Sequence, residues 1–267
     1  MKAKLSVPIE KLNELVESNK FIGETVDLDV LKFSGVFVLK NAFSKKTIEK
    51  YAKTYFNGDG LNRTTFHLTE VKFDEQHDLT KIISESAFIN IASQFFNGNV
   101  GSNSIRIVKK DNVDVKPVFL HQDICYEIGG LEKYSLFIPL THCNPENGSL
   151  ILYPGTQHFG YLGEAGEINP DILPKLYPKI VSNTQPGDVL VMHSSVWHES
   201  PANKTLTDRV YLQVNIQDVN DSTTKNVICG VRTSEWSNLL TVDEIFVNSR
   251  TQRLKSLYQQ VNELTAK

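Results

Sequence analysis

The pattern of hydrophobic and polar positions changes after Asn97. From there on, short runs of alternating apolar and polar residues are separated by Gly, Pro and Asn, which is typical of an antiparallel sandwich or barrel. The segments "NPENGS" and "TQPGDV" predict turns between such runs, because Asn-Gly and Pro-Gly pairs favour tight turns. The strands predicted from these runs are residues 104–110, 118–124, 134–140, 149–155, 188–193 and 209–217.

Before this region the apolar spacing is mostly helical. A short helical pattern ends at Gly35, the apolar run "VFVLK" follows, and a second helix is predicted to open near Ser44. Residues 79–96 also have helical spacing, and so does the segment after Val231, which predicts a terminal helix packed outside the sheet. We therefore expect a mainly β fold with flanking helices.

Two further segments need structural interpretation. Residues 160–182 contain many Gly and Pro residues and little periodicity, which predicts a long surface loop or lid. Residues 209–217 form a strand with two distinct faces, and from this strand alone the polar face either meets water or lines the mouth of a barrel. The apolar face holds Val210, Leu212, Val214 and Ile216, and the polar face holds Arg209, Tyr211, Gln213, Asn215 and Gln217.

Composition limits the class of protein. The chain has 267 residues, of which 40% are hydrophobic and 22% charged, so we expect a globular protein with one core. Its 28 basic and 31 acidic residues give a formal charge of -3, and no stripe of Lys or Arg tracks along it. Nucleic acid is therefore not an expected partner.

The sequence also indicates a cellular compartment. The first twenty residues lack a secretory apolar core, and no apolar run is long enough to span a bilayer, so we expect a cytoplasmic protein without membrane contact. The three cysteines Cys125, Cys143 and Cys229 lack disulfide-framework or zinc-finger spacing, so we interpret them as small buried residues.

The stretch "FLHQDICYE" places His121 and Asp123 two residues apart in a predicted strand. Residues at positions i and i+2 of a strand project from the same face, so both side chains could reach one point. Imidazole nitrogen and carboxylate oxygen are ligands of Fe(II), and a set of two histidines and one carboxylate leaves coordination positions open. On its own this pair is a weak motif, because it lacks the second histidine.

Two residues are candidates for that second histidine. His193 ends a predicted strand and His198 follows five residues later, and both cannot be ligands of a site that stays open. His198 is favoured because it lies in a predicted polar turn before the strand that carries Arg209. The planar fork of an arginine there could bind a carboxylate with two hydrogen bonds.

These motifs together resemble the phytanoyl-CoA dioxygenase family of Fe(II)- and 2-oxoglutarate-dependent oxygenases. The similar segments are "HQD" at His121, "NGSLILYPGTQH" from Asn147, "PGDVLVMH" from Pro186, "HESPAN" from His198 and Arg209 in "DRVYL". The segment "VLKFSGVFVLKNAFSKKTIEKY" resembles the N-terminal unit of the family. The ordered set is a strong signal although each motif alone is weak.

The resemblance implies a site for three groups: Fe(II), the co-substrate 2-oxoglutarate and O2. It implies that His121, Asp123 and His198 bind iron, and that Arg209 holds the distal carboxylate of 2-oxoglutarate with help from Ser200.

The resemblance also implies a fold and a further pocket residue. The fold would be a double-stranded β-helix, a cupin-like jelly roll with a core of about residues 99–217 inside a single domain of residues 1–267. The polar face of the strand at 209–217 would look into this barrel. Phe137 falls where the family often has an aromatic or apolar residue that lines the co-substrate pocket.

The activity implied is hydroxylation of a small-molecule metabolite or biosynthetic intermediate, with release of succinate and CO2. Desaturation, cyclisation and epimerisation stay open, whereas Asp123 argues against halogenation, because related halogenases lack the carboxylate ligand. No basic cluster suits the phosphates of CoA. The alternatives are a non-catalytic jelly-roll binding protein and a cupin-like metalloenzyme that does not use 2-oxoglutarate.

Four residues near these motifs have two possible roles each. His193 is either a core residue that closes a strand or a hydrogen-bond partner of a ligand. Trp197 either shields the metal or packs beneath a loop. Tyr126 and Glu127 either touch substrate or form a solvated rim.

Overall fold

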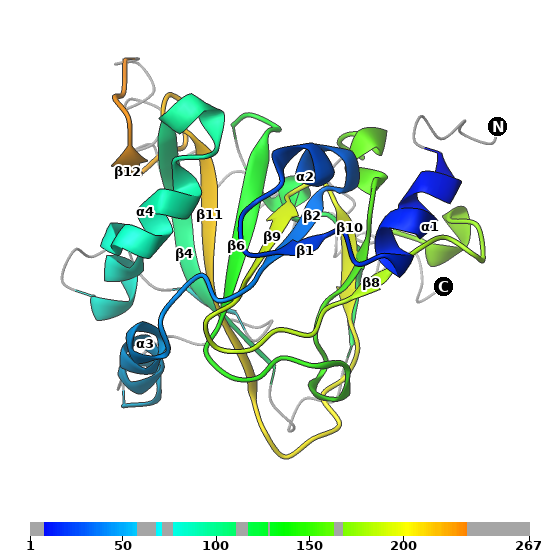
Figure 1. Ribbon diagram of the computed structural model, residues 1–267, viewed down its shortest axis with the longest axis horizontal. Coiled ribbons are helices and arrows are strands. Elements are labelled where there is room, and N and C mark those ends of the chain that lie inside the picture. Colours follow the sequence, from blue (N-terminus) through cyan, green and yellow to red (C-terminus); the bar gives the residue numbers. More distant parts are fainter. Residues whose placement is uncertain are drawn as a thin grey trace, which may run out of the picture.

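The computed structural model describes residues 8–57, 68–70, 77–110, 117–127, 129–162 and 168–233. It contains two β-sheets that pack against each other as a jelly roll (Figure 1). Every neighbouring pair of strands is antiparallel except β1 and β2, which are parallel. The predicted mainly β fold and its double-stranded β-helix architecture are therefore confirmed.

The larger sheet contains the two longest strands of the described chain, β4 and β11, side by side. β3 (Leu68–Glu70) also pairs with β4. Apart from β3, the strands of the larger sheet are, in spatial order, β1 (Ile22–Gly23), β2 (Val36–Leu39), β9 (Val189–His193), β6 (Lys133–Pro139), β11 (Arg209–Asp218), β4 (Val100–Lys110) and β12 (Asn226–Cys229).

The smaller sheet faces the inner side of the larger one. Leu152 and Ile180 from the smaller sheet share a buried cluster with Val38, Leu190 and Tyr211 from the larger sheet. In spatial order the strands of the smaller sheet are β5 (Val118–His121), β10 (Trp197–Ser200), β7 (Ile151–Tyr153) and β8 (Ile180–Val181).

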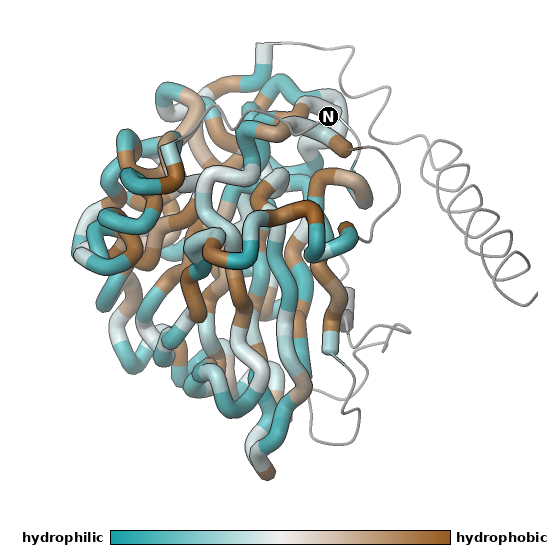
Figure 2. Tube along the Cα trace, turned by 90° about the vertical axis from the view of Figure 1, so that its right-hand side faces the viewer, coloured by the Kyte–Doolittle hydropathy of each residue, from teal (hydrophilic) through white to brown (hydrophobic). Residues whose placement is uncertain are grey.

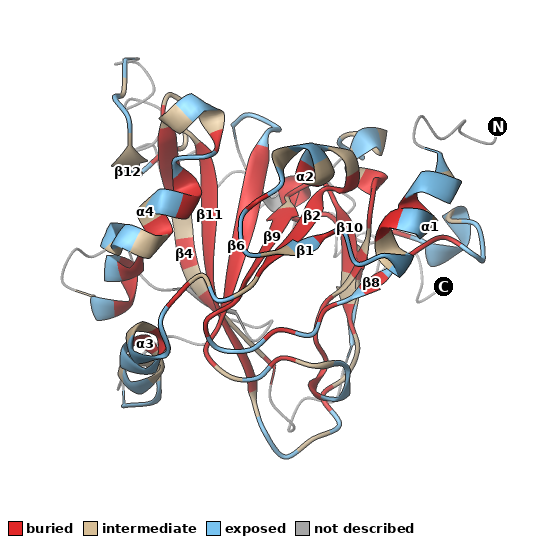
Figure 3. Cartoon of the chain, in the orientation of Figure 1, coloured by how far each residue is buried: buried red, intermediate tan, exposed pale blue. Residues whose placement is uncertain are grey.

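Helices cover the outer face of the larger sheet. Residues of α3 (Lys45–Asn57), α4 (Ser86–Ala92) and the 3-10 helix η1 (Asp78–Ser84) share one apolar cluster with the outward residues of the strands. Figure 3 shows that strands β6, β9 and β11 of the larger sheet are almost entirely buried. Figure 2 shows hydrophobic and hydrophilic residues alternating along the strands, as a sheet with two different environments requires.

Strand β11 shows how this alternation is used. Its apolar side chains Val210, Leu212, Val214 and Ile216 pack beneath the helices. Its polar side chains are also buried, so they line the inside of the barrel and do not meet water. The orientation implied by the family resemblance is confirmed.

The N-terminal unit largely matches the prediction. Helix α2 (Leu28–Ser34) begins at Asp27, whose carboxylate accepts hydrogen bonds from two backbone N–H groups, and it ends at Gly35 with a φ of 75°. Strand β2 and helix α3 follow, and β2 adds to the larger sheet. Helix α1 (Ile9–Glu17) packs through Leu12 and Leu15.

Three predictions of elements need correction. The helix predicted over residues 79–96 is broken into η1 and α4, because Glu85 is extended and its carboxylate accepts a 2.7 Å hydrogen bond from Tyr51. Residues 160–182, predicted as a loop, contain the 3-10 helix η6 (Pro170–Ile172) and strand β8. The turn predicted around His198 is strand β10.

The terminal helix predicted after Val231 falls almost entirely outside the described residues. Among the helices that are described, none has the length and apolar character needed to cross a membrane.

Candidate functional site

The two histidines singled out by sequence lie on neighbouring strands. His121 ends β5 and His198 is the second residue of β10, and the two are direct partners in the antiparallel ladder. Their ring centroids are 4.2 Å apart. Directly opposed residues of an antiparallel pair share a face, so both imidazoles point to the same side of the smaller sheet.

Asp123 joins them by a different route from the predicted one. The strand stops at His121, and Asp123 opens the 3-10 helix η3 (Asp123–Tyr126). The turn is held by Gln122, whose side-chain amide donates a 2.8 Å hydrogen bond to the carbonyl of Ser195. The prediction of one continuous strand through Asp123 is wrong, yet its carboxylate still reaches the histidines.

The placement of His198 also needs correction. It lies within β10, which pairs with β5 on one side and with β7 on the other, and its exposed fraction is only 3%. The sequence looked like a polar turn because the inward residues of this strand, His198 and Ser200, are polar. Trp197 points to the other side and packs on Phe159 with ring centroids 5.1 Å apart, which supports the packing role.

Three ligand atoms converge at this point. The Nε2 atoms of His121 and His198 each lie 3.6 Å from Oδ1 of Asp123. One ligand atom from each of the three residues lies within 4.8 Å of the others, and no other His, Cys, Asp or Glu residues in the described part of the chain form such a group.

The hydrogen bonds of the two imidazoles define which nitrogen is available. Nδ1 of His121 lies 2.8 Å from the carbonyl oxygen of Phe119, and Nδ1 of His198 lies 3.0 Å from that of Val196. A carbonyl only accepts, so each Nδ1 carries a hydrogen, and the Nε2 atom is the one that can offer a lone pair to a metal. This arrangement orients both Nε2 atoms for a metal ion.

The electrostatics favour the charge states that bind metals. Burial and the nearby His121 lower the pKa of His198 to about 4, so its imidazole is neutral near pH 7. Burial alone would raise the pKa of Asp123, but His198, His121 and Arg106 together hold it well below its usual range. Asp123 is therefore an anion near pH 7.

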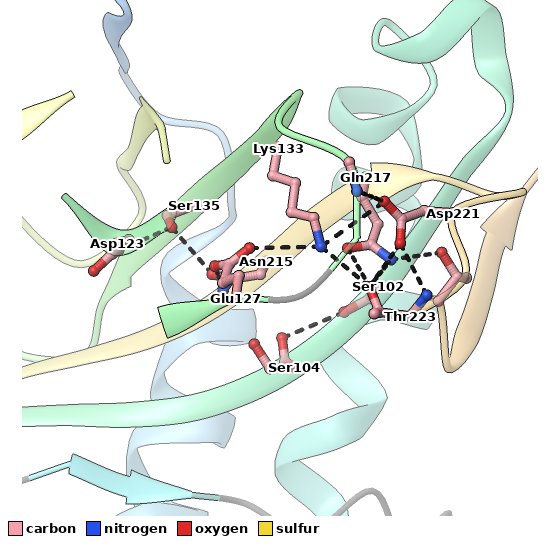
Figure 4. Close-up of polar contacts among 12 residues, drawn as sticks. Ser102, Ser104, Asp123, Glu127, Lys133, Ser135, Asn215, Gln217, Asp221 and Thr223 are labelled. Atoms are coloured by element: carbon pink, nitrogen blue, oxygen red, sulfur yellow. Dashed lines mark hydrogen bonds and ion pairs between the residues drawn. The ribbon is translucent and has the colours of Figure 1, made fainter. Parts of the chain in front are cut away.

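The second oxygen of Asp123 has its own partners. Oδ2 accepts a hydrogen bond from Ser135 at 3.3 Å and lies 3.5 Å from Nε2 of Gln213 and 3.8 Å from Nη2 of Arg106. Figure 4 shows Ser135 between Asp123 and Asn215. Sequence reasoning did not assign roles to these residues, although Gln213 and Asn215 stand out on the polar face of residues 209–217.

Toward the end of β11, a buried lysine at the start of β6 joins this network. Nζ of Lys133, which has no exposed surface, lies 3.8 Å from Glu127 and 3.9 Å from Asp221 (Figure 4). Asn215 donates a 2.6 Å hydrogen bond to Glu127, whose side chain is 9% exposed. Burial raises the pKa of Glu127 to about 7 against the opposing effect of Lys133. Glu127 therefore does not belong to a solvated rim.

Arg209 lies at the opposite end of β11 from Gln217, the ladder partner of Lys133. It begins β11 and is 2% exposed, and its Nη1 donates to the carbonyl of Gly148 at 2.9 Å and to Oγ of Ser200 at 3.1 Å. Its Nε is buried without a hydrogen-bond partner, and no described carboxylate forms an ion pair with it. Ser200 follows His198 by two residues, so the arginine is tied to the strand that carries the histidine.

Phe137 lies on the inner face of the larger sheet. It is the ladder partner of Gln213, and its ring contacts that of Tyr211 with centroids 5.6 Å apart. The guanidinium of Arg209 lies 5.3 Å from the centroid of the Tyr211 ring. The structure thus brings Arg209, Ser200 and Phe137 into one region, with Tyr211 between the arginine and the phenylalanine.

His193 is separate from this site. It lies 3.4 Å from Glu132 and packs edge-on against the ring of Tyr134, on the side of the sheet that faces away from the barrel interior. It is neither a ligand of the three-residue group nor a hydrogen-bond partner of one. The side chain of Tyr126 lies outside the described residues, so the alternatives for it stay open.

Comparison with known proteins identifies the family. Residues 32–211 match the family model of phytanoyl-CoA dioxygenase (PhyH). The chain belongs to this family. It is an Fe(II)- and 2-oxoglutarate-dependent dioxygenase, as the resemblance of its motifs implied. A search of curated proteins found no match to the sequence.

Solved structures share the fold of this PhyH-family chain. The epimerase SnoN, solved with Fe3+, α-ketoglutarate and nogalamycin RO, has a TM-score of 0.63 at 13% identity and covers 72% of this chain and 82% of its own. The carbocyclase SnoK has a TM-score of 0.62 at 17% identity, and the match covers 82% of this chain and 91% of SnoK. EctD from S. alaskensis, solved with 2-oxoglutarate and 5-hydroxyectoine, has a TM-score of 0.63 at 19% identity. The match covers 72% of this chain and 74% of EctD.

Proposed function

We propose that the chain binds Fe(II) through His121, Asp123 and His198, binds 2-oxoglutarate through Arg209, and hydroxylates a small-molecule substrate. The observation that carries this proposal is the convergence of two imidazole Nε2 atoms and one carboxylate oxygen at one point inside the barrel. Two histidines with one carboxylate form the ligand set of Fe(II) oxygenases, which leaves positions open for co-substrate and oxygen.

The donor set fits a divalent metal chemically. Both imidazoles are fixed by hydrogen bonds from Nδ1 to backbone carbonyls, and Asp123 supplies the negative charge. Both Nε2 atoms face Oδ1 of the Asp123 carboxylate at 3.6 Å, while both Nδ1 atoms are used by backbone carbonyls. A metal ion at this point satisfies all three groups at once.

The Arg209 region fits the distal carboxylate of 2-oxoglutarate. A buried arginine whose Nε has no acceptor and which lacks a carboxylate partner among the described residues is costly unless an anion joins it. Ser200 and His198 are two residues apart on one strand, so the arginine's contact with Ser200 lies about 7 Å along the strand from His198. Such a span suits a five-carbon dicarboxylic acid with one end at the metal.

Each part of the chain then has a task. Strands β5 and β10 hold the two imidazoles at fixed separation, and β11 holds Arg209 from the opposite sheet. The buried apolar side chain of Phe137 lies on the inner face of the larger sheet and helps to keep bulk water from the site. When bound, iron and 2-oxoglutarate supply the oxidation, in which O2 gives one oxygen atom to succinate and one to the hydroxylated product, with loss of CO2.

The substrate class follows from the site and its relatives. SnoN and EctD were solved with small molecules, nogalamycin RO and 5-hydroxyectoine, and SnoK is a carbocyclase. We therefore assign a small-molecule metabolite or biosynthetic intermediate as the substrate of this chain. The carboxylate of Asp123 lies where it would ligate the metal, which favours hydroxylation over halogenation.

The experiment that tests this proposal measures 2-oxoglutarate turnover. Purified protein with Fe(II), ascorbate and O2 is expected to form succinate, faster when the correct small molecule is present. Arg209→Leu is expected to lose this turnover. Wild-type protein that bound a small molecule tightly without any metal or co-substrate would favour the non-catalytic binding protein, and metal-dependent chemistry insensitive to Arg209→Leu would favour a cupin-like enzyme.

A further inference from the structure

The contacts of Asp123 are divided cleanly between its two oxygens. Both histidine Nε2 atoms approach Oδ1 at 3.6 Å, whereas Ser135, Gln213 and Arg106 approach only Oδ2. One oxygen therefore faces the proposed metal and the other faces protein hydrogen-bond donors. Such a division favours a carboxylate that binds metal through a single oxygen.

Gln213 contacts every member of the group around Oδ2. Its Oε1 accepts a 2.8 Å hydrogen bond from Nε of Arg106, and its Nε2 lies 3.0 Å from both Oγ of Ser135 and Oδ1 of Asn215. The side chain is 1% exposed, so these bonds are shielded from water. Its own distance to Oδ2 of Asp123, 3.5 Å, is longer than any of these three.

The hydrogen bonds of the Gln213 amide influence the direction of the Ser135 hydroxyl. The amide of Gln213 has two N–H hydrogens, which go to Ser135 and Asn215, the two acceptors at 3.0 Å. Ser135 accepts from Gln213, and Asn215 already accepts from the same amide. The single hydroxyl hydrogen of Ser135 has two acceptors in reach, Oδ1 of Asn215 at 3.1 Å and Oδ2 of Asp123 at 3.3 Å, and the negative charge of the carboxylate favours Oδ2.

The orientation of the Gln213 amide is itself fixed. Nδ2 of Asn215 donates to Glu127 at 2.6 Å, so Oδ1 of Asn215 must be the atom that faces Gln213. At its other end, Oε1 of Gln213 holds Nε of Arg106, which leaves Nη2 of that arginine 3.8 Å from Asp123. The reverse orientation of Gln213 would put its N–H groups against the arginine.

We infer that Gln213 is a positioning residue: through Ser135 and Arg106 it holds Oδ2 of Asp123 and leaves Oδ1 alone for the metal. This inference rests on the proposed iron site. It assigns Gln213 an effect on metal coordination, and no direct contact with metal or substrate. A residue that only filled the barrel would change stability and leave metal coordination unaltered.

The test uses Co(II) as the metal and the variant Gln213→Met, which keeps the length of the side chain and removes both its donor and its acceptor. Gln217→Met is the matched control, because Gln217 is equally buried on the same face of β11 but bonds to Thr223 and Thr224. Gln213→Met is expected to bind Co(II) about 10-fold more weakly and to change its visible absorption bands, which report coordination number. Gln217→Met is expected to keep both properties.

Ser135→Ala is a second variant that removes only one of the three groups that approach Oδ2. It should shift Co(II) affinity in the same direction but less, and it carries the test if Gln213→Met does not fold. Folded variants at both positions with wild-type Co(II) affinity and spectrum would overturn the inference while leaving the iron site intact. Wild-type protein that binds Co(II) no better than Asp123→Ala would instead overturn the proposed function.

Discussion

His121 and His198 are ladder partners across β5 and β10, with ring centroids 4.2 Å apart and both Nε2 atoms 3.6 Å from one carboxylate oxygen of Asp123. Two strands that are remote in sequence thus supply the two imidazoles, and the turn after the first strand supplies the carboxylate. Because the backbone hydrogen bonds of the strands fix this pair, the site is preformed.

Removing the carboxylate should remove the metal site and not the fold. Asp123→Ala is expected to weaken binding of Fe(II) or Co(II) at least about 100-fold, because it deletes one of three ligands and the only anion among them. Thermal unfolding with and without metal measures the effect, since a metal bound only to the native state raises the melting temperature. A variant as strongly stabilised by metal as the wild type would show that the ion binds elsewhere.

Arg209 should matter for the co-substrate and little for the apoprotein. Arg209→Leu removes a buried cation that has no described carboxylate partner, so the free energy of unfolding without ligand is expected to fall by no more than about 1 kcal/mol, or to rise. Stabilisation by 2-oxoglutarate should disappear, while stabilisation by metal alone should persist. Denaturant unfolding with each ligand separately distinguishes these outcomes, and loss of both stabilisations would contradict the assignment.

The raised pKa of Glu127 predicts that the stability of the fold depends on pH. Its pKa in the folded protein is about 7, above that of the unfolded chain, because burial outweighs the attraction of Lys133. The folded state therefore holds this proton more tightly, and the corresponding stability is present below about pH 4.5 and lost as pH rises through 7.

Replacing Glu127 with the neutral isostere should reveal this loss. The unfolding free energy of Glu127→Gln relative to the wild type is expected to increase between pH 5 and pH 8, by up to about 3 kcal/mol. Denaturant titrations of both proteins at several pH values measure it. A constant difference across this range would mean that Glu127 keeps an ordinary pKa despite its burial.

The buried Lys133 should be strongly required for stability. Lys133→Met leaves Glu127 and Asp221 in the barrel without the ammonium that lies within 4 Å of both, so a loss of about 3 kcal/mol or more is expected. Lys45→Met is the control, because that side chain is 87% exposed and should cost little. An equally small effect of both substitutions would show that this network contributes little.

The alternating pattern of the larger sheet could be predicted because its strands have one face on the helices and one in the barrel. The prediction failed at β10, a strand of four residues whose inward residues are polar and whose outward residues include Glu199. Strand β10 carries His198 and Ser200 inward, so its hydrophobic period is hidden and it looked like a turn. The break at Glu85 depends on Tyr51, which is remote in sequence.

The candidate site could also be predicted only in part from the sequence. Its ligand-type residues could be predicted from motif order, because iron and 2-oxoglutarate require particular side chains. The network around Oδ2 of Asp123 could not, since Arg106, Ser135 and Gln213 come from three strands whose register only the folded sheet defines. Their common feature in sequence is no more than a polar residue on the inner face.

The most direct test of the central claim is an anaerobic titration with Fe(II) followed by 2-oxoglutarate, monitored by visible absorption. The account predicts a saturable charge-transfer band of the chelated keto acid in the wild type, none in Asp123→Ala, and a greatly weakened one in Arg209→Leu. Correctly folded wild-type protein that shows no band at saturating Fe(II) and 2-oxoglutarate would contradict it.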